Sequence, residues 1–435
     1  MEIFVKKSAF IFLLLGSQCS ASASEIPKNN PEYLSYEIKQ GENLSIIASK
    51  YLEGDQALNI LLRLNDKNKP NSIPVGEKIL LPKSLLKYSS STATVSKLNC
   101  SNAFLVNNNP QQIEIGSVLN QDDIIKVPAG CQVGVTLEDG SNINLVSGSV
   151  LKFKTLRTSA MEKSPQVDFE LMNGRVDVEV VKRAKGDAPF EIHTPKALAG
   201  VRGTQFRVGF DEQKNTSQVE VKNGIVAAKG QANDSGESLT ENQGIPISED
   251  GLAGAVETLP LSPNFLAIEK QIPASLIKVK FQADQNADRH ILRQSQDATF
   301  SQILEDHLVD IAQIELNQLS NNAVFYQWIS LTKSGLQGSP GEYAICKSDS
   351  ADQADRCNVG FNMRGFKSMS MYVQKFDEIT KAYQDVVKTG QTISEREVFL
   401  LKNLPAGKYQ WQMSYKAGDD AKVERKGIFD LIVVN

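Results

Sequence analysis

The sequence predicts a mainly β, multi-domain protein, and three observations lead to this fold class. Residues 99–251 alternate between apolar and polar side chains and carry Asp-Gly or Asn-Gly dipeptides, the strongest short-range signals of β-hairpins. The tripeptide Tyr-Gln-Trp occurs twice in the last third, at 326–328 and 409–411. Helical spacing is clear in one short stretch, 36–82. A chain of 435 residues should hold about three or four domains.

The N-terminus has the pattern of a secretory signal. Lys6 and Lys7 precede a short apolar run, AFIFLLLG, and the small residues SQCSASA follow. We expect a signal peptide over 1–23, cleaved after Ala23, because the apolar run is shorter than the about 20 residues of a membrane span. Later segments are not apolar enough to cross a membrane. The mature chain should therefore be soluble and exported, to the periplasm or cell envelope, with secretion left open.

Cys19 raises the alternative of a lipid-modified N-terminal cysteine, although Gln18 stands where a small residue is expected. If Cys19 leaves with the signal, Cys100, Cys131, Cys346 and Cys357 remain. An even number of cysteines in an exported protein favours disulfides. Three pairings are open. Cys100–Cys131 with Cys346–Cys357 is preferred because each bridge then stays within one predicted domain.

Residues 33–83 predict a small domain of the order strand, helix, helix, strand. Tyr36 and Ile38 begin it, and Gly41 ends the first strand. Asn43 or Ser45 should cap a helix whose apolar face holds Leu44, Ile47, Ala48 and Tyr51. A second helix should stop near Asn65, and Lys78–Pro82 should form the closing strand.

This stretch resembles a LysM module, on Tyr36, Gly41, Leu44, Ile47-Ala48, Tyr51, Asn65, Ile73-Pro74, Gly76 and Leu81-Pro82. Glu42 stands where the family more often has Asp. The resemblance implies binding to glycans that contain N-acetylglucosamine, chiefly peptidoglycan or chitin, in a groove between two loops. Carried over, the groove residues are Gly41, Glu42, Asn43, Leu44, Asn71, Ser72, Ile73, Pro74 and Val75. The alternative is a spacer with weak or no sugar affinity.

Residues 84–98, rich in Ser and Thr, predict a linker, and 99–251 an all-β domain. Hairpin turns are expected at Asp139-Gly140, Asn173-Gly174 and Asn223-Gly224. Gly203 lies between two predicted strands. A phosphate-binding loop needs a helix after its glycines, so close packing or a positive φ explains Gly203 better.

The same region resembles a FecR domain over roughly 99–250, on Asp139-Gly140-Ser141, Asn173-Gly174, Thr194-Pro195 and residues 201–206. In its best-known setting this domain is the periplasmic part of an anti-sigma regulator that senses an outer-membrane transporter. A signal peptide and a LysM module come first here, so that setting is in doubt. The resemblance then implies an exported scaffold or a protein-contact module. Arg202 could be a contact residue, or a strand-turn arginine that is solvated or paired locally.

The repeated tripeptides sit in similar surroundings, and we expect two modules, 261–345 and 346–435. They resemble immunoglobulin-like or fibronectin type III β-sandwiches. The tryptophans could be sugar-stacking platforms, but their repetition at the same strand phase favours core positions. Residues 298–316 could be helical or could form short strands.

No catalytic, metal-binding or cofactor-binding constellation is evident. The three histidines, His193, His290 and His307, are scattered. Asp122 and Asp123 are adjacent, so on a strand they point to opposite faces. Distant carboxylates that could serve a cell-wall enzyme stay open. The net charge of −4 argues against nucleic-acid binding, which needs a clustered basic face.

The sequence thus predicts a non-catalytic envelope protein that binds peptidoglycan and uses its β domains for protein or ligand contacts. The alternative is an envelope-sensing regulator that acts through the FecR-like domain and an envelope or outer-membrane partner.

Overall fold

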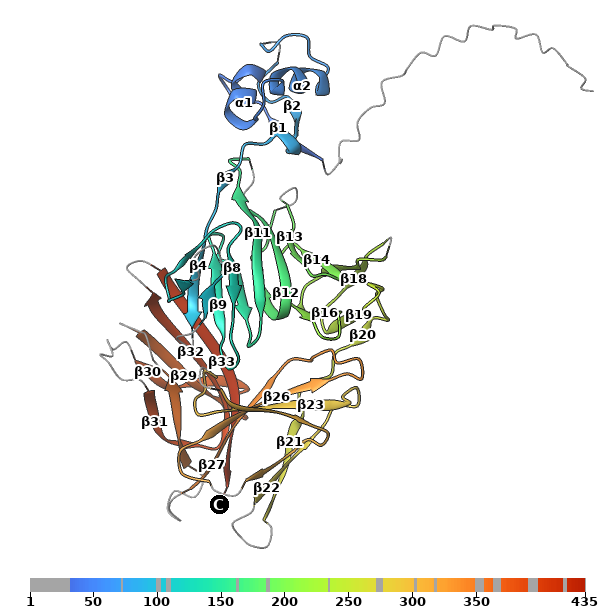
Figure 1. The fold of residues 1–435 in the computed structure, drawn as a ribbon. Coiled ribbons are helices and arrows are strands. Elements are labelled where there is room, and N and C mark those ends of the chain that lie inside the picture. The colour runs from blue at the N-terminus through green and yellow to red at the C-terminus, as the bar shows by residue number, and fades with distance from the viewer. Residues whose placement is uncertain are drawn as a thin grey trace, which may run out of the picture. The chain divides into compact units, whose positions relative to one another are not determined.

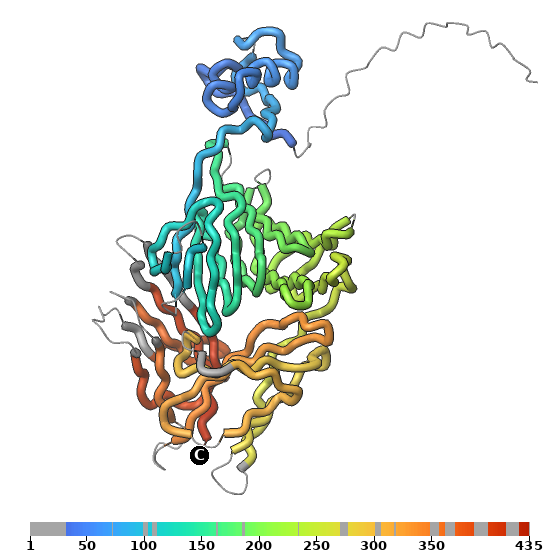
Figure 2. Tube along the Cα trace, viewed as in Figure 1, coloured from blue at the N-terminus to red at the C-terminus, as the bar shows by residue number. Residues whose placement is uncertain are grey.

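The computed structural model describes residues 32–71, 73–98, 103–106, 111–161, 164–184, 188–233, 235–270, 277–300, 303–316, 319–348, 356–362, 369–389, 398–417 and 421–434. The expected signal peptide, Ser72 and Cys100 lie outside this part of the chain. The protein divides into two compact units, Met1–Leu86 and Lys87–Asn435. Figure 1 shows the elements of both units, and Figure 2 follows the chain through them.

The first unit has the predicted order of elements: β1 (Tyr33–Glu37), α1 (Leu44–Tyr51), α2 (Ala57–Leu64) and β2 (Lys78–Pro82). The two strands pair antiparallel, with Tyr36 opposite Ile79. A short 3-10 helix, η1 (Lys83–Leu85), follows. Leu44, Ile47, Leu61 and Leu81 are fully buried between the helices and the sheet.

Two asparagines define the ends of the helices. The Asn43 Oδ1 atom accepts the Ile46 N–H at 2.9 Å, so Asn43 is the N-cap of α1, one of the two residues expected. Asn65 is the C-cap of α2, where the second helix was predicted to stop. Its amide donates to the Leu61 and Leu80 carbonyls and accepts the Leu80 N–H at 2.7 Å, which ties α2 to β2.

The second unit begins with a β domain made of two sheets around one core. Sheet 1 has the strand order β6-β5-β8-β11-β12-β13-β14-β17-β18, with β3 also beside β11, and sheet 2 has the order β7-β4-β9-β10-β12-β15-β16-β19-β20. Their bounds are β3 Ser89–Ser90, β4 Ala93–Leu98, β5 Phe104–Leu105, β6 Gln111–Gln112, β7 Val118–Leu119, β8 Ile124–Lys126, β9 Val133–Leu137, β10 Asn142–Leu145, β11 Val150–Thr158, β12 Gln166–Glu179, β13 Phe190–His193, β14 Ala197–Val201, β15 Gln205–Asp211, β16 Thr216–Asn223, β17 Val226–Gly230, β18 Glu237–Leu239, β19 Gln243–Ile247 and β20 Glu257–Thr258.

The inward faces of the two sheets supply the core. Phe153, Phe169, Phe190 and Phe206 are fully buried there, and their rings form a chain with centroid separations of 4.9 to 6.4 Å. Most of the remaining core residues are Val, Ile, Leu and Ala at alternate strand positions, as a half-buried sheet requires.

One of the three expected hairpin turns is a hairpin, and two are not. Asp139-Gly140 connects the paired strands β9 and β10. Asn173-Gly174 lies inside β12, where this strand leaves sheet 1 and enters sheet 2: Asn173 is opposite Val150, and Gly174 is opposite Phe210. Asn223-Gly224 links β16 of sheet 2 to β17 of sheet 1, which do not pair. A positive φ at glycine therefore serves both reversal within a sheet and crossing between sheets.

The predicted linker 84–98 is wrong for most of its length. Leu86 is fully buried in the first unit, and residues 93–98 form β4 of sheet 2. Ala93 and Val95 are fully buried in the β domain. Small Ala and Thr side chains hid this alternation, although Thr is common in strands. The β domain therefore begins before residue 99, the predicted boundary.

The last third forms β-sandwiches. Its strands are arranged in separate sheets. One has the order β21-β22-β25, one is the pair β28-β31, and one has the order β24-β23-β26-β27-β33-β32-β29-β30. The bounds are β21 Asn264–Lys270, β22 Ile277–Gln282, β23 Arg289–Ser295, β24 Ile303–Val309, β25 Gln313–Leu316, β26 Val324–Leu331, β27 Gly341–Lys347, β28 Arg356–Asn362, β29 Met369–Asp377, β30 Ala382–Thr389, β31 Val398–Pro405, β32 Gly407–Ala417 and β33 Ala421–Val434. Residues 298–316 thus contain strands, one of the two expectations.

The internal repeat appears as a repeated pairing pattern. In the first copy β22 pairs with β25, and β23 pairs with β24 and β26; in the second, β28 pairs with β31, and β29 pairs with β30 and β32. β27 and β33, the last strands of the two copies, pair parallel. The boundary predicted between residues 345 and 346 falls inside β27. That strand closes the first module and also belongs to the second.

Both tryptophans are core residues, as their repetition predicted. Trp328 is 0% exposed and Trp411 is 5% exposed, in two separate cores. Ala298 and Phe300, from the loop after β23 of the first module, pack into the second core. The two modules therefore share structure, and neither tryptophan is a sugar platform.

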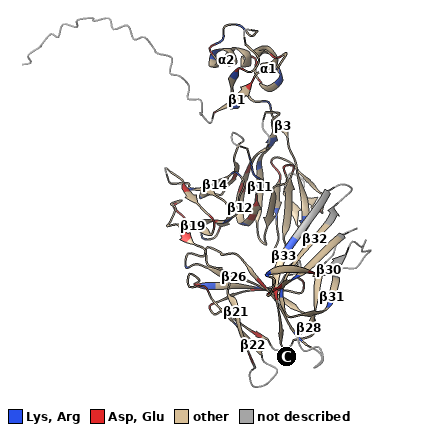
Figure 3. Cartoon of the chain, turned by 180° about the vertical axis from the view of Figure 1, so that it is seen from behind, with Lys and Arg blue, Asp and Glu red and all other residues tan. Residues whose placement is uncertain are grey.

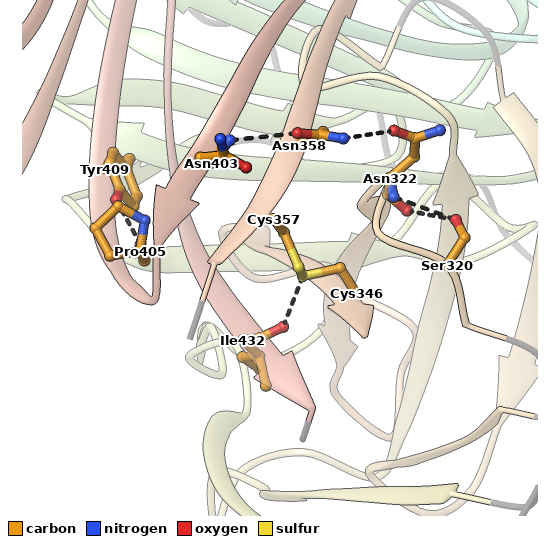
Figure 4. The surroundings of a disulfide bond; sticks show 9 residues. All are labelled: Ser320, Asn322, Cys346, Cys357, Asn358, Asn403, Pro405, Tyr409 and Ile432. Atoms are coloured by element: carbon orange, nitrogen blue, oxygen red, sulfur yellow. Dashed lines mark hydrogen bonds between the residues drawn. A yellow bond between two sulfur atoms is a disulfide. The ribbon is translucent and has the colours of Figure 1, made fainter. Parts of the chain in front are cut away.

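Cys346 and Cys357 form the expected disulfide, with their Cα atoms 6.3 Å apart (Figure 4). The bond joins β27 to β28 across the core of the second module. Figure 4 also shows Tyr409 at the start of β32, whose hydroxyl donates to the Pro405 carbonyl at 2.5 Å. This is the tyrosine corner of immunoglobulin-like sandwiches. Cys131 is also disulfide-bonded.

Among the helices in the described part of the chain, none combines the length and the apolar character needed to cross a membrane.

Candidate functional site

Two loops of the first unit meet at the start of α1. The Leu44 N–H, at the first residue of α1, donates to the Pro70 carbonyl at 3.1 Å. The Gly76 N–H donates to the Ile38 carbonyl at 2.8 Å, and the Ile38 N–H donates to the Glu77 carbonyl at 2.9 Å. These bonds hold the loop after β1 beside the loop before β2. The structure therefore brings together the two loops that carry the predicted groove residues.

Four of those residues present an open surface. Gly41, Asn71, Pro74 and Val75 are exposed, and Val75 is 65% exposed. Gly41 has a φ of +83°, and a Cβ atom there would have no neighbour within 4 Å. Ile73 is half-buried beside them. Exposed backbone next to an apolar wall suits a ligand that combines amide groups with a flat apolar face.

Three other predicted residues have structural roles that limit their contact with a ligand. The Leu44 side chain is fully buried, so it belongs to the core and not to the groove surface. The Asn43 Oδ1 atom caps α1. The Glu42 carboxylate accepts the Tyr36 hydroxyl at 2.7 Å and the Lys39 N–H at 3.0 Å.

Glu42 is ionised and firmly held. Partial burial acts to raise the pKa of Glu42, but the hydrogen bonds from Lys39 and Tyr36 outweigh it and keep this pKa below its ordinary value. Burial and the bond to Glu42 raise the pKa of Tyr36. The Tyr36–Glu42 pair thus fixes the loop after β1. No sequence pattern indicates this pair, because it depends on the angle at which the loop leaves β1.

Ile46 is an exposed residue that sequence reasoning missed. It lies in the first turn of α1, off the apolar face, and is 45% exposed. Its N–H donates to the Asn43 Oδ1 atom, so it lies in the same helical turn as the predicted residues Asn43 and Leu44. In the sequence, the only indication of this exposure was that Ile46 is apolar but does not lie on the apolar face of the predicted helix.

In the β domain, Gly203 is explained by close packing, as expected. It lies between β14 and β15 with a φ of +123°, and a Cβ atom there would come within 2.7 Å of the Lys182 Cα atom. Arg202 is exposed. The Arg183 side chain is buried beside this corner, where it donates to Asp139 at 3.1 Å and to the Pro165 carbonyl at 2.6 Å. The motif residues therefore build a corner of the domain, not an anion cradle.

The histidines with described contacts lie far apart in the fold. His290 is 2% exposed, contacts Ser330 at 3.2 Å and packs edge-on against Trp328, and burial lowers the pKa of His290. His193 lies on β13, 3.2 Å from Asp168. Within the described ranges, no group of three or more His, Cys, Asp or Glu side chains could hold a metal ion. Figure 3 shows Lys and Arg interspersed with Asp and Glu over the strands.

Comparison with known families agrees with both resemblances. The model of the LysM domain matches residues 36–82, and the model of the FecR protein matches residues 123–227. No curated protein matches the chain.

Several solved structures are similar over part of the chain. An anti-sigma factor candidate from Parabacteroides distasonis ATCC 8503 is 26% identical over 31% of this chain and 59% of its own, with a TM-score of 0.27. This chain therefore spans about three fifths of that protein. The FN1–FN3 domains of chicken CNTN1 are 10% identical over 54% of this chain and 94% of theirs, with a TM-score of 0.15.

The domain identities rest on the family matches and the folds together. The first unit has the βααβ order and the paired loops, and the second begins with the two-sheet β domain. The chain therefore contains a LysM domain followed by a FecR domain, with immunoglobulin-like sandwich modules after them.

Proposed function

We propose that this is a non-catalytic, exported protein of the cell envelope that binds peptidoglycan through its LysM domain. The open surface of Gly41, Asn71, Pro74 and Val75 between two bonded loops is the observation that carries the proposal. The LysM match and the signal-like N-terminus support it. The FecR domain and the sandwich modules then contact other envelope proteins or ligands.

The ligand chemistry follows from this surface. N-acetylglucosamine offers an acetamido group to exposed backbone amides and the Asn71 side chain, and an apolar ring face to Pro74 and Val75. Neutral contacts of this kind are individually worth about 0.5–1.5 kcal/mol, so several must act together for stable binding to a repeating polymer.

Cosedimentation of the full chain with purified sacculi tests this function. The variant Val75→Asp places a charge in the apolar wall and should lower the bound fraction at least about tenfold. Asn59→Asp adds the same charge to an exposed position on α2 and should bind like the unaltered protein. If the unaltered protein stays in the supernatant, or if both variants bind equally, the LysM groove is not a peptidoglycan anchor.

The FecR match supports a second candidate, an envelope-sensing role through residues 123–227. The full chain, cross-linked in envelope extracts, should then capture a specific protein at sites within the FecR domain. Cross-links confined to the LysM domain would argue against this role.

A further inference from the structure

A row of charged side chains crosses the outer face of sheet 2 in the FecR domain. Asp177 on β12 is opposite Arg207 on β15, and Arg207 is opposite Glu220 on β16. They face away from the core, because their neighbours Val176, Phe206 and Val219 face into it. Arg207 Nε lies 2.8 Å from Asp177 Oδ1, and Arg207 Nη1 lies 3.2 Å from Glu220 Oε2.

Two further cations complete this charged row. Arg175 Nη1 lies 3.2 Å from Glu220 Oε2, and Lys222 Nζ lies 2.7 Å from Asp177 Oδ1. Although burial acts to raise it, Arg207 and Lys222 hold the pKa of Asp177 well below its ordinary value. Asp177 therefore stays ionised.

Charges on the outer face of a sheet are normally in solvent, but the centre of this row is not. The Arg207 side chain is 4% exposed and the Glu220 side chain is 1% exposed. The segment over them is 332–338, the tip of the hairpin formed by β26 and β27 of the first sandwich module. Burying charges is costly unless each finds partners, so this coverage needs specific contacts.

The hairpin tip supplies those contacts from its main chain. The Gln337 N–H donates to Glu220 Oε1 at 2.7 Å, and Arg207 Nη1 donates to the Gln337 carbonyl at 3.4 Å. The Gln218 amide donates to the Ser334 carbonyl at 3.3 Å. Glu220 thus binds the N–H and Arg207 the C=O of one residue, Gln337, so the contact does not depend on the Gln337 side chain.

An apolar anchor lies beside this polar contact. Leu336 is fully buried and packs near Gly244 on β19, together with Leu259. A Cβ atom on Gly338 would overlap the Pro260 carbonyl oxygen, so the tip fits closely against the segment that leaves the FecR domain.

We propose that Arg207 and Glu220 form a docking site for a main-chain turn on the FecR domain, and that the occupant in this chain is its own hairpin tip, residues 332–338. The contact covers Arg207 and Glu220 at the centre of the row and couples the FecR domain to the sandwich. Another protein can reach these two side chains only after the tip is displaced.

Single-amide hydrogen exchange on the full chain tests the proposal. The Gln337 N–H bonds to Glu220, whereas the Gly338 N–H bonds to Ser330 within the sandwich and serves as an internal reference. In Glu220→Ala, the Gln337 amide should exchange about ten- to a hundredfold faster, the range for a lost charge-assisted bond. Gly338 should be unchanged. Glu237→Ala, at an exposed carboxylate on β18, should leave both amides unchanged.

An unchanged Gln337 rate in Glu220→Ala would overturn the proposal. If that variant loses protection throughout the FecR domain, Leu336→Ala decides, because it removes the anchor without altering the charges. Faster exchange at Gln337 with β15 and β16 still protected supports a separable docking contact. Retained protection at Gln337, or loss of protection everywhere, overturns it.

Discussion

Two glycines with the same backbone conformation should respond very differently to the same substitution. Gly140 and Gly174 both have a φ of +86° and both follow a polar residue, Asp139 or Asn173. A Cβ atom on Gly140 would meet only Val181, at 3.7 Å. On Gly174 it would come within 2.5 Å of the Ser149 Cα atom. The pair Gly140→Ala and Gly174→Ala therefore separates the cost of backbone conformation from the cost of close approach.

The magnitudes follow from these contacts. A left-handed conformation costs an ordinary residue about 1–2 kcal/mol, partly offset by about 0.4–1 kcal/mol from the less flexible unfolded chain. Gly140→Ala should thus lower the free energy of unfolding by about 1 kcal/mol or less. Gly174→Ala adds an overlap with backbone, and overpacking costs about 1–3 kcal/mol.

Ser149 cannot easily move aside to relieve that overlap. Its Oγ atom donates to the Arg175 carbonyl at 2.8 Å and accepts the Arg175 N–H at 3.0 Å, on the far side of Gly174. Its carbonyl accepts the Val127 N–H at 2.8 Å. Losing one of these bonds adds about 1 kcal/mol, so the two variants should differ by about 2–4 kcal/mol.

Tryptophan fluorescence would miss this effect, since both tryptophans lie in the sandwich modules. Hydrogen exchange at Val176 and Val178 on β12, together with urea unfolding followed by circular dichroism, reports on the FecR domain. If Gly174→Ala and Gly140→Ala agree within about 0.5 kcal/mol, the close approach of β12 to Ser149 does not constrain the crossing between sheets.

Three further predictions concern the other domains. Replacing Cys346 and Cys357 together by Ala should lower the stability of the second sandwich module by about 3 kcal/mol, because the disulfide closes a loop of 11 residues. An unchanged midpoint of urea unfolding, followed by tryptophan fluorescence, would contradict this. Burial raises the pKa of Glu342 from its ordinary value near 4.5 to about 7. The folded state therefore favours the protonated carboxyl group, and the free energy of unfolding falls as the pH rises through this range. Glu342→Gln should remove about 1–3 kcal/mol of that loss at pH 8 in unfolding curves, and equal pH profiles for both proteins would refute it. Tyr36→Phe removes the hydrogen bond from the Tyr36 hydroxyl to the Glu42 carboxylate. Nuclear magnetic resonance titration should then show a higher pKa for Glu42, and binding to sacculi should weaken several-fold. An unchanged Glu42 pKa would show that the Lys39 amide alone holds the loop.

The sequence predicted the elements whose signals are local. Asn43 and Asn65 mark the ends of the LysM helices, and the alternation of Val and Phe marks the FecR strands. The repeated Tyr-Gln-Trp tripeptide predicted two similar sandwiches with buried tryptophans. Caps, alternation and repeats are properties of neighbouring residues, so they can be read without knowing how the chain folds back on itself.

The predictions that failed depended on distant partners. Asn-Gly indicates a positive φ, but not whether the next strand returns to the same sheet or crosses to the other, and at Gly174 and Gly224 it crosses. The boundary predicted between residues 345 and 346 required each strand to belong to one module, whereas β27 belongs to both.

The sequence by itself predicted the order of domains, the helices of the LysM domain and the alternating strands, because each depends on residues close together in the chain. Only the tertiary structure decided that Tyr36 holds Glu42 and that a hairpin tip covers Arg207 and Glu220. Those facts arise from contacts between residues as far apart as Glu220 and Gln337. Such contacts depend on strand order and sheet crossing, which local patterns do not specify.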